Sequence, residues 1–132
     1  MDLSERTREA LRAGGRLHDA GRYLEAHEAW EVAWKGERGE ARALLQGLIH
    51  VTTALFHAVV RKRPAGALRL LRSGLSRLDA LPEGAAGLEL GRFRCEVAAA
   101  LDAAVRWERG ELARFPEELR PRLFPGSAAR DG

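Results

Sequence analysis

The sequence predicts an all-α protein, a single compact bundle of about five helices with a buried central third helix. Apolar residues recur at the helical period of about 3.6 in successive segments, and no segment alternates as a strand would. Glycines and prolines such as Gly21, Pro64 and Pro82 separate these segments. The chain has 132 residues, 45% of them hydrophobic, which suits one domain with an ordinary core.

The first two helices are predicted on either side of Gly21. Asp2 or Ser4 can cap the first helix, because side-chain oxygens accept hydrogen bonds from its free N–H groups. His18 lies near the end of this helix, where we expect a surface or capping residue. The second helix is predicted to begin near Arg22 or Tyr23. Its predicted inward stripe is Tyr23, Ala26, His27, Trp30, Ala33 and Trp34.

The third helix, from about Glu40 to Arg63, is apolar on nearly every face, which predicts a central position among the other helices. Pro64 ends it and suits the first position of the fourth helix. The fourth helix has a stripe formed by Leu68, Leu71, Leu75 and Leu78. Its opposite side holds Arg69, Arg72, Ser76 and Arg77.

A fifth helix is predicted after the loop at Pro82, with Leu90, Phe93, Val97, Leu101 and Ala104 on its buried face. Beyond Gly110, the prolines at 116, 121 and 125 permit only short turns. We therefore predict a bundle domain over residues 1–112. Residues 113–132 are predicted to form a proline-containing segment with a frayed tail.

The cysteine content, the N-terminus and the most apolar stretch of the chain bear on its cellular compartment and on membrane contact. The single cysteine, Cys95, leaves no disulfide partner within the chain. The N-terminus is charged and lacks an apolar core, so we expect no signal peptide and a cytoplasmic location. Residues 44–60 are strongly apolar, but Gln46, His50 and His57 interrupt them. We therefore expect a buried helix and no membrane partner.

The charge balance gives little support for a polyanionic partner. Lys and Arg total 22 against 19 Asp and Glu, a net charge of +3. We expect basic residues to alternate with acidic ones over the surface. Arg69, Arg72 and Arg77 are then better explained as a solvated helix face than as a phosphate site, and nucleic acid is not an expected partner. RNA binding through this arginine face stays as a third hypothesis.

Four polar residues in the apolar third helix are the main functional clue. Gln46, His50, Thr53 and His57 are spaced by four, three and four residues, which places them on one helix face. A short loop makes the second and third helices antiparallel, so His27 and Glu31 are predicted to lie opposite Gln46 and His50. Each buried polar group without a partner costs about 1–3 kcal/mol. These groups must therefore satisfy one another, water or a ligand.

Three interpretations of this polar seam stay open. The side chains could be a hydrogen-bonded cluster that fixes helix register, a pocket for a small ligand or metal, or an acid–base catalytic site. Residues 27–31 match only half of the zinc-protease motif H-E-x-x-H, because Glu31 stands where the second histidine belongs. For a divalent metal such as zinc, nickel or iron, the candidate ligands are His27, Glu31 and His50. The predicted pocket comprises Tyr23, His27, Glu28, Glu31, Trp34, Gln46, His50 and His57.

Residues 21–78 resemble the bacterial domain of unknown function 309 family. The residues that carry the resemblance are Gly21, Tyr23, Glu25, His27, Glu28, Glu31, Trp34, Gln46, Gly47, Leu48, Ile49, His57, Gly66 and Ala67. The resemblance implies a compact all-helical protein from a family without an established activity. Within the predicted pocket, it directs attention to His27, Glu28, Glu31, Gln46 and His57.

The alternative function is a non-catalytic interaction module or a homo-oligomer. Gly21, Tyr23, Ala26, Trp30 and Ala33 fit the spacing of a tetratricopeptide helix pair, although no second copy follows about 34 residues later. An apolar patch left exposed after folding would support this alternative. The expected patches are Leu119, Leu123 and Phe124, or the leucine stripe of the fourth helix.

Overall fold

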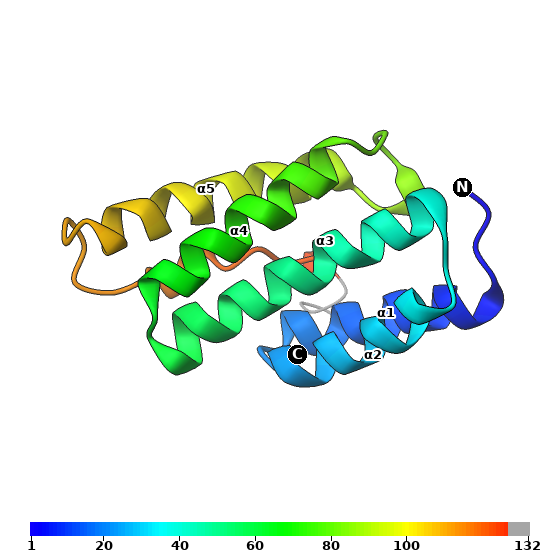
Figure 1. The fold of residues 1–132 in the computed structure, drawn as a ribbon, viewed down its shortest axis with the longest axis horizontal. Coiled ribbons are helices and arrows are strands. Elements are labelled where there is room, and N and C mark those ends of the chain that lie inside the picture. The colour runs from blue at the N-terminus through cyan, green and yellow to red at the C-terminus, as the bar shows by residue number, and fades with distance from the viewer. Residues whose placement is uncertain (127–132) are drawn as a thin grey trace.

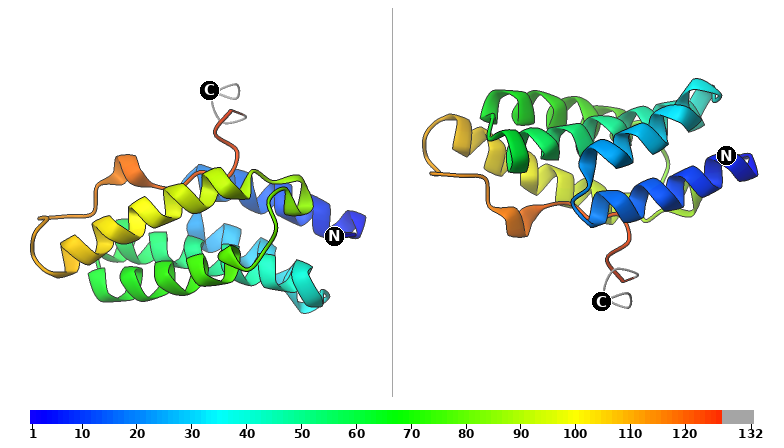
Figure 2. Two further views of the ribbon diagram at one scale, coloured as in Figure 1. Left: turned by 90° about the horizontal axis from the view of Figure 1, so that it is seen from above. Right: turned by 90° about the horizontal axis from the view of Figure 1, so that it is seen from below.

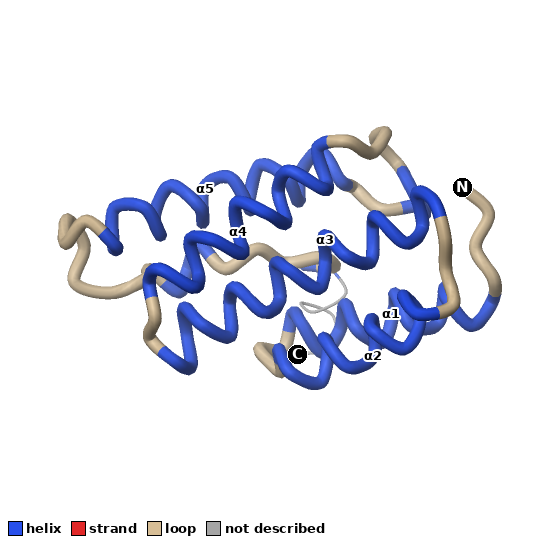
Figure 3. Tube along the Cα trace, viewed as in Figure 1, coloured by secondary structure: helices blue, strands red, loops and turns tan. Residues whose placement is uncertain are grey.

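The computed structural model describes residues 1–126, and this part of the chain contains helices but no strand (Figure 3). The prediction of an all-α bundle is confirmed. The long helices are α1 (Glu5–Asp19), α2 (Tyr23–Lys35), α3 (Gly39–Leu55), α4 (Pro64–Asp79) and α5 (Leu90–Glu108). Three short elements complete the fold, the π-helix η1 (Phe56–Arg61) and the 3₁₀ helices η2 (Ala85–Gly87) and η3 (Glu117–Leu119).

The helices form two layers. Helices α2, α3 and α4 lie side by side in one layer, which faces the viewer in Figure 1. Helices α1 and α5 and the C-terminal segment lie behind it, with α5 crossing obliquely (Figure 2). The layer therefore has an inner face that is covered by the rest of the chain and an outer face that is not.

Local chemistry explains where the helices begin and end. The Ser4 hydroxyl accepts a hydrogen bond from the Thr7 N–H and caps α1. At the other end, Gly21 adopts a left-handed φ of 81°, and the Arg22 N–H reaches back to the Leu17 carbonyl. This is the glycine-terminated helix end in which left-handed backbone is least costly. The predicted roles of Ser4 and Gly21 are both confirmed.

Helix α3 is the most deeply buried element, as the sequence predicts. Leu44, Leu45, Leu48, Val51 and Leu55 have no exposed surface. The stretch 39–61 is long and apolar enough to cross a membrane by length and composition, and more than half of its most apolar window is buried inside the bundle. Burial between neighbouring helices accounts for its composition.

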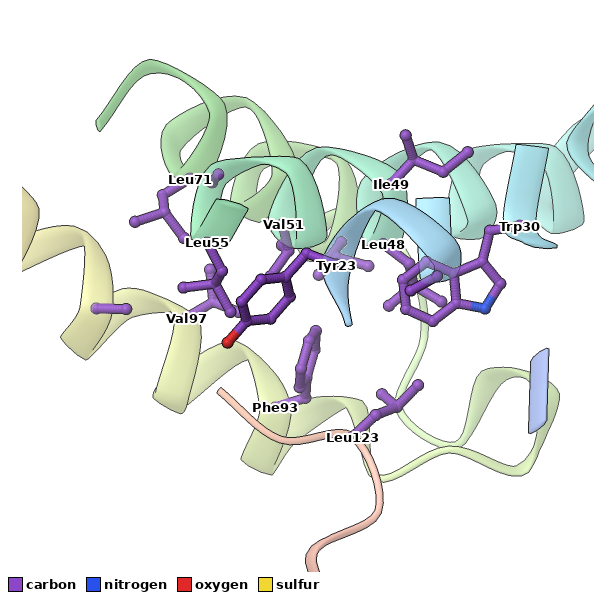
Figure 4. Close-up of a cluster of buried hydrophobic side chains, with 14 of the residues drawn as sticks. Tyr23, Trp30, Leu48, Ile49, Val51, Leu55, Leu71, Phe93, Val97 and Leu123 are labelled. Carbon is purple, nitrogen blue, oxygen red and sulfur yellow. The ribbon is translucent and has the colours of Figure 1, made fainter. Parts of the chain in front are cut away.

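Aromatic side chains join the two layers (Figure 4). Tyr23 and Trp30 project from α2 towards Phe93 of α5, and all three are almost completely buried. Gly14 of α1 lies against Trp30, where a Cβ atom would overlap the indole ring. The missing side chain at this position therefore lets α1 approach α2 closely.

The C-terminal segment is packed as part of the bundle as far as Phe124. Phe115 and Leu123 are buried, and the Arg92 guanidinium donates hydrogen bonds to the carbonyls of Arg122 and Leu123. The predicted exposed patch is wrong for Leu123, because the core covers it, while Leu119 is 38% exposed. The predicted frayed tail lies mainly in residues 127–132, outside the described residues.

Candidate functional site

The predicted polar residues of α2 interact along their own helix. His27 Nε2 lies 3.2 Å from Glu31 Oε2, and Lys35 Nζ lies 3.7 Å from the other Glu31 oxygen. His27 and Glu31 are about one-third exposed, and Glu28 is exposed to solvent. These contacts between residues four apart are typical of a solvated helix face.

The predicted polar residues of α3 turn towards α4. Gln46 Nε2 lies 2.8 Å from His50 Nε2, and His50 Nδ1 lies 2.8 Å from Ser73 Oγ of α4. Thr53 donates its hydroxyl hydrogen to the carbonyl of Ile49 within α3. Gln46 and His50 therefore share a face, as predicted, and their third partner is Ser73.

The predicted meeting of two polar sets between α2 and α3 is therefore wrong. Within residues 1–126, no hydrogen bond joins His27 or Glu31 to Gln46 or His50. The loop length fixes which turns of two antiparallel helices are level with each other, but it does not fix the rotation of each helix. The same described region holds no cluster of three or more His, Cys, Asp or Glu side chains suited to a metal ion, so His27, Glu31 and His50 do not assemble one.

The other predicted pocket residues lie apart from one another. Tyr23 is a core residue with 4% exposure. Trp34 is half-buried, and the guanidinium of Arg42 lies 3.9 Å from the centre of one of its rings. His57 belongs to η1, where its ring packs beside Phe56 and against Gly66.

The most buried polar cluster contains a residue that the sequence interpretation placed at the surface. His18 is only 2% exposed, with Nδ1 2.9 Å from Thr52 Oγ1 and Nε2 2.8 Å from the Pro121 carbonyl oxygen. A carbonyl only accepts, so Nε2–H donates to Pro121. Burial lowers the pKa of His18, so Nδ1 carries no proton at neutral pH and accepts from the Thr52 hydroxyl. The prediction of a surface His18 is wrong.

Two glycines bring α3 and α4 close together beneath Gln46, His50 and Ser73. A Cβ at Gly74 would lie 2.8 Å from the Val51 side chain and 3.1 Å from the Gly47 carbonyl oxygen. A Cβ at Gly47 would lie 2.9 Å from Leu78. This close approach allows the short Ser73 side chain to reach the His50 ring.

The hydrogen bonds among Gln46, His50 and Ser73, which form the α3–α4 seam, all run in one direction. The Gln46 amide N–H donates to His50 Nε2, and His50 Nδ1–H donates to the Ser73 oxygen. Within the described chain, the Ser73 hydroxyl hydrogen has no acceptor. The seam therefore ends in a hydroxyl that can donate to an incoming oxygen atom.

The electrostatics of the seam favour a neutral histidine and a negative ligand. Burial lowers the pKa of His50, and the charges of Arg77 and Arg69 lower it further. Both arginines are exposed and form no ion pair with an acidic residue in the described chain. Arg69, Ser73 and Arg77 are four residues apart, which places Ser73 between the two arginines on one helix face.

The expected alternation of charge is wrong for this part of the molecule. From Ala41 to Leu78, which covers nearly all of α3 and α4, the sequence contains no acidic residue. The same stretch contains seven of the 22 basic residues, namely Arg42, Arg61, Lys62, Arg63, Arg69, Arg72 and Arg77. The remaining 15 basic residues share the rest of the chain with all 19 acidic ones, so the small net charge averages a basic and an acidic part.

A separate cavity of about 670 Å³ opens where the start of α1 meets the loop between α4 and α5. Leu3, Leu11, Leu88 and Phe124 form apolar walls, and Arg8 also lines it. None of the predicted pocket residues lines this cavity, so the polar seam and the cavity are distinct features.

We expect the free energy of unfolding to fall as the pH drops below about 6.5, the ordinary pKa of histidine. The pKa values of His18, His50 and His57 are all lowered in the folded protein, so the unfolded chain binds protons at higher pH than the folded one. This stabilisation is complete above about 6.5 and is lost progressively on acidification, by up to about 1.4 kcal/mol per pH unit for the buried His18. Urea unfolding on both sides of this pH measures the effect.

The control for this pH dependence is His18→Gln, which removes the most buried of the three imidazoles. We expect the variant to be less stable at neutral pH but to lose less stability on acidification. A wild-type free energy of unfolding that stays constant or increases on acidification would contradict the predicted sign.

The comparisons with known proteins agree with the family resemblance. No curated protein matches the chain. Residues 11–70 match the family model of the domain of unknown function DUF309, a segment that includes α2, α3, η1 and the beginning of α4. This match supports assigning residues 11–70, a little under half of the chain, to the DUF309 family.

Proposed function

We propose that the protein binds a small phosphate-bearing ligand on the outer face of α3 and α4. In this proposal, Ser73 donates its hydroxyl hydrogen to a phosphate oxygen, while Arg69 and Arg77 supply positive charge on either side. Gln46 and His50 position Ser73. The proposal keeps Gln46 and His50 from the predicted pocket. It places the ligand between α3 and α4 instead of between α2 and α3.

The observation that carries the proposal is the directed hydrogen-bond chain from Gln46 through His50 to Ser73, between two arginines that have no acidic partner within residues 1–126. A site with an unused hydroxyl donor and two guanidinium groups suits the oxygens of an anion. It does not suit a metal cation, which would be repelled by the arginines and needs acceptor ligands.

The same geometry favours binding over nucleophilic catalysis. An activated serine must give its proton to a base, but in this arrangement the Ser73 oxygen accepts a hydrogen bond from the protonated Nδ1 of His50. The histidine is in turn oriented by the neutral amide of Gln46, which stabilises a charged imidazole less than a carboxylate would. A serine that is held as a donor therefore has a recognition role.

Isothermal titration calorimetry with inorganic pyrophosphate and with a nucleoside triphosphate tests the proposal by measuring the dissociation constants. We expect Ser73→Ala to weaken binding several-fold, and the pair Arg69→Ala and Arg77→Ala to weaken it by about tenfold or more, equivalent to about 1.4 kcal/mol. Both arginines are exposed, so the fold should be retained. Circular dichroism and urea unfolding check this point.

A matched control exists on the other layer of the bundle. Arg8 and Arg16 of α1 are also eight residues apart and exposed, so Arg8→Ala with Arg16→Ala removes the same charge at the same spacing. We expect this control to bind both probes almost as tightly as the wild type. Equal weakening in the two double variants, or no binding by the wild type, would refute the site.

A further inference from the structure

We propose that the natural ligand of this site is a polymer, the phosphodiester backbone of a nucleic acid, bound along a basic face of η1 and α4. The basic face comprises Arg61, Lys62, Arg63, Arg69, Arg72 and Arg77. The inference rests on the proposed function, because Arg69 and Arg77 belong to both sites. It adds the requirement that affinity depends on ligand length.

The first support is the separation of charge within the chain. All six residues of the basic face are exposed, and none forms an ion pair with an acidic residue in the described chain. By contrast, Arg92, Arg94 and Arg106 of α5 each contact carboxylates. The positive charge on η1 and α4 is therefore available to an external anion.

The second support is the length of the basic face. An α-helix rises about 1.5 Å per residue, so the 14 steps from Arg63 to Arg77 extend over about 21 Å. In a stacked, helical strand, phosphates follow one another about every 3.4 Å along the helix axis, so this distance corresponds to about six of them. The three phosphates of a nucleoside triphosphate would leave about half of the face unused.

The third support is that the charges of η1 and α4 act on the same two neighbouring histidines. Besides burial, the charges of Arg63, Arg61 and Arg69 lower the pKa of His57 at the start of the face. Besides burial, the charges of Arg77 and Arg69 lower the pKa of His50, which lies beside α4. Arg69 therefore acts on both histidines, which places the cations of η1 and α4 in one field.

Surface composition favours a nucleic acid backbone over a lipid surface. Membrane-bound basic helices insert several large apolar side chains into the bilayer. Between Phe56 and Asp79 of the described chain, Val60 is the only large apolar residue that is exposed, at 54%. No aromatic ring is presented for base stacking here either, because Phe56 is partly buried in the core. These residues can therefore bind phosphates but cannot distinguish one base sequence from another.

Fluorescence anisotropy with labelled oligoadenylates of about 2, 4, 8 and 16 nucleotides tests the inference. We expect affinity to rise steeply up to about six nucleotides and only slowly beyond. For the longest oligonucleotide, the logarithm of the association constant should fall with the logarithm of salt concentration with a slope near −4, about −0.7 for each phosphate neutralised. DNA of the same length should bind equally well, and a strong preference for one base sequence would contradict backbone recognition.

Two triple variants separate this inference from the proposed function. Replacing Arg61, Lys62 and Arg63 by alanine should weaken binding of the longest oligonucleotide by about tenfold or more and leave pyrophosphate binding unchanged. The control replaces Arg106, Arg109 and Arg114, which are also exposed and lie outside the basic face. We expect this control to retain most of its affinity for the oligonucleotide.

The outcomes that overturn the inference differ from those that overturn the proposed function. Tight pyrophosphate binding without any dependence on oligonucleotide length would remove the polymer and keep the small-ligand site. Binding to phosphatidylserine vesicles without binding to any oligonucleotide would replace nucleic acid by a membrane surface. Failure to bind pyrophosphate and oligonucleotides alike would remove both proposals.

Discussion

Replacing His18 by alanine is expected to lower the free energy of unfolding by about 4 kcal/mol, since loss of a large buried side chain costs about 2–5 kcal/mol. The His18 ring is surrounded by the rings of Tyr23, Trp30 and Phe93, at centre-to-centre distances of 5.6, 5.9 and 6.3 Å. The substitution removes this packing and leaves the hydroxyl of Thr52 without its ring partner. Urea unfolding monitored by circular dichroism measures the change.

Two further variants separate packing from hydrogen bonding at this position. His18→Leu keeps most of the volume but removes both ring nitrogens, so we expect an intermediate loss of about 1–3 kcal/mol. The double variant His18→Leu with Thr52→Val also removes the Thr52 hydroxyl, which has lost its hydrogen-bond partner. It should recover part of the lost stability, because replacing both partners of a buried pair is far less costly than replacing one. A His18→Ala variant within about 1 kcal/mol of the wild type would show that the cluster does not hold the layers together.

The helices were predictable because their signals are local. Ser4 and Gly21 act on the turn that contains them, and Pro64 is compatible with a first helical position whatever follows it. The all-round apolar composition of α3 also predicts its central place, since only a helix with neighbours on several sides can bury it. These features need no knowledge of distant contacts.

The buried cluster was not predictable in the same way. The partners of His18 lie 34 and 103 residues away, at Thr52 and Pro121, so proximity in sequence gives no indication of them. One local signal did exist, because His18 continues the helical period of Thr7, Leu11 and Gly14, all of which are buried. A histidine on that stripe is an inward residue, even near the end of its helix.

The seam between α3 and α4 shows what helix spacing can and cannot establish. The interval of four residues correctly places Gln46 and His50 on one face. It cannot decide between α2 and α4 as the neighbour, because a residue at the edge of that face can turn to either side. The presence of Gly47 and Gly74, which allow the two helices to approach, is the feature that directs His50 towards Ser73.

Replacing Asp19 by alanine is expected to lower the free energy of unfolding by about 3 kcal/mol and to loosen the C-terminal segment. The two carboxylate oxygens of Asp19 accept hydrogen bonds from the backbone N–H groups of Leu123 and Phe124, at 2.6 and 2.7 Å. Hydrogen bonds to a charged acceptor contribute about 1.5–3 kcal/mol each, and part of this is offset by water in the variant. Urea unfolding measures the stability.

Trypsin gives an independent measure of the segment itself, because Arg120 and Arg122 flank Pro121, whose carbonyl holds His18. We expect cleavage after Arg122 to be much faster in the Asp19→Ala variant, since the chain must leave the bundle to enter a protease. The matched control is Asp19→Asn, which keeps one carbonyl acceptor and should show about half of the loss in stability. If Asp19→Ala unfolds and is cleaved like the wild type, the attachment of residues 121–124 depends on the burial of Leu123 and on Arg92 instead.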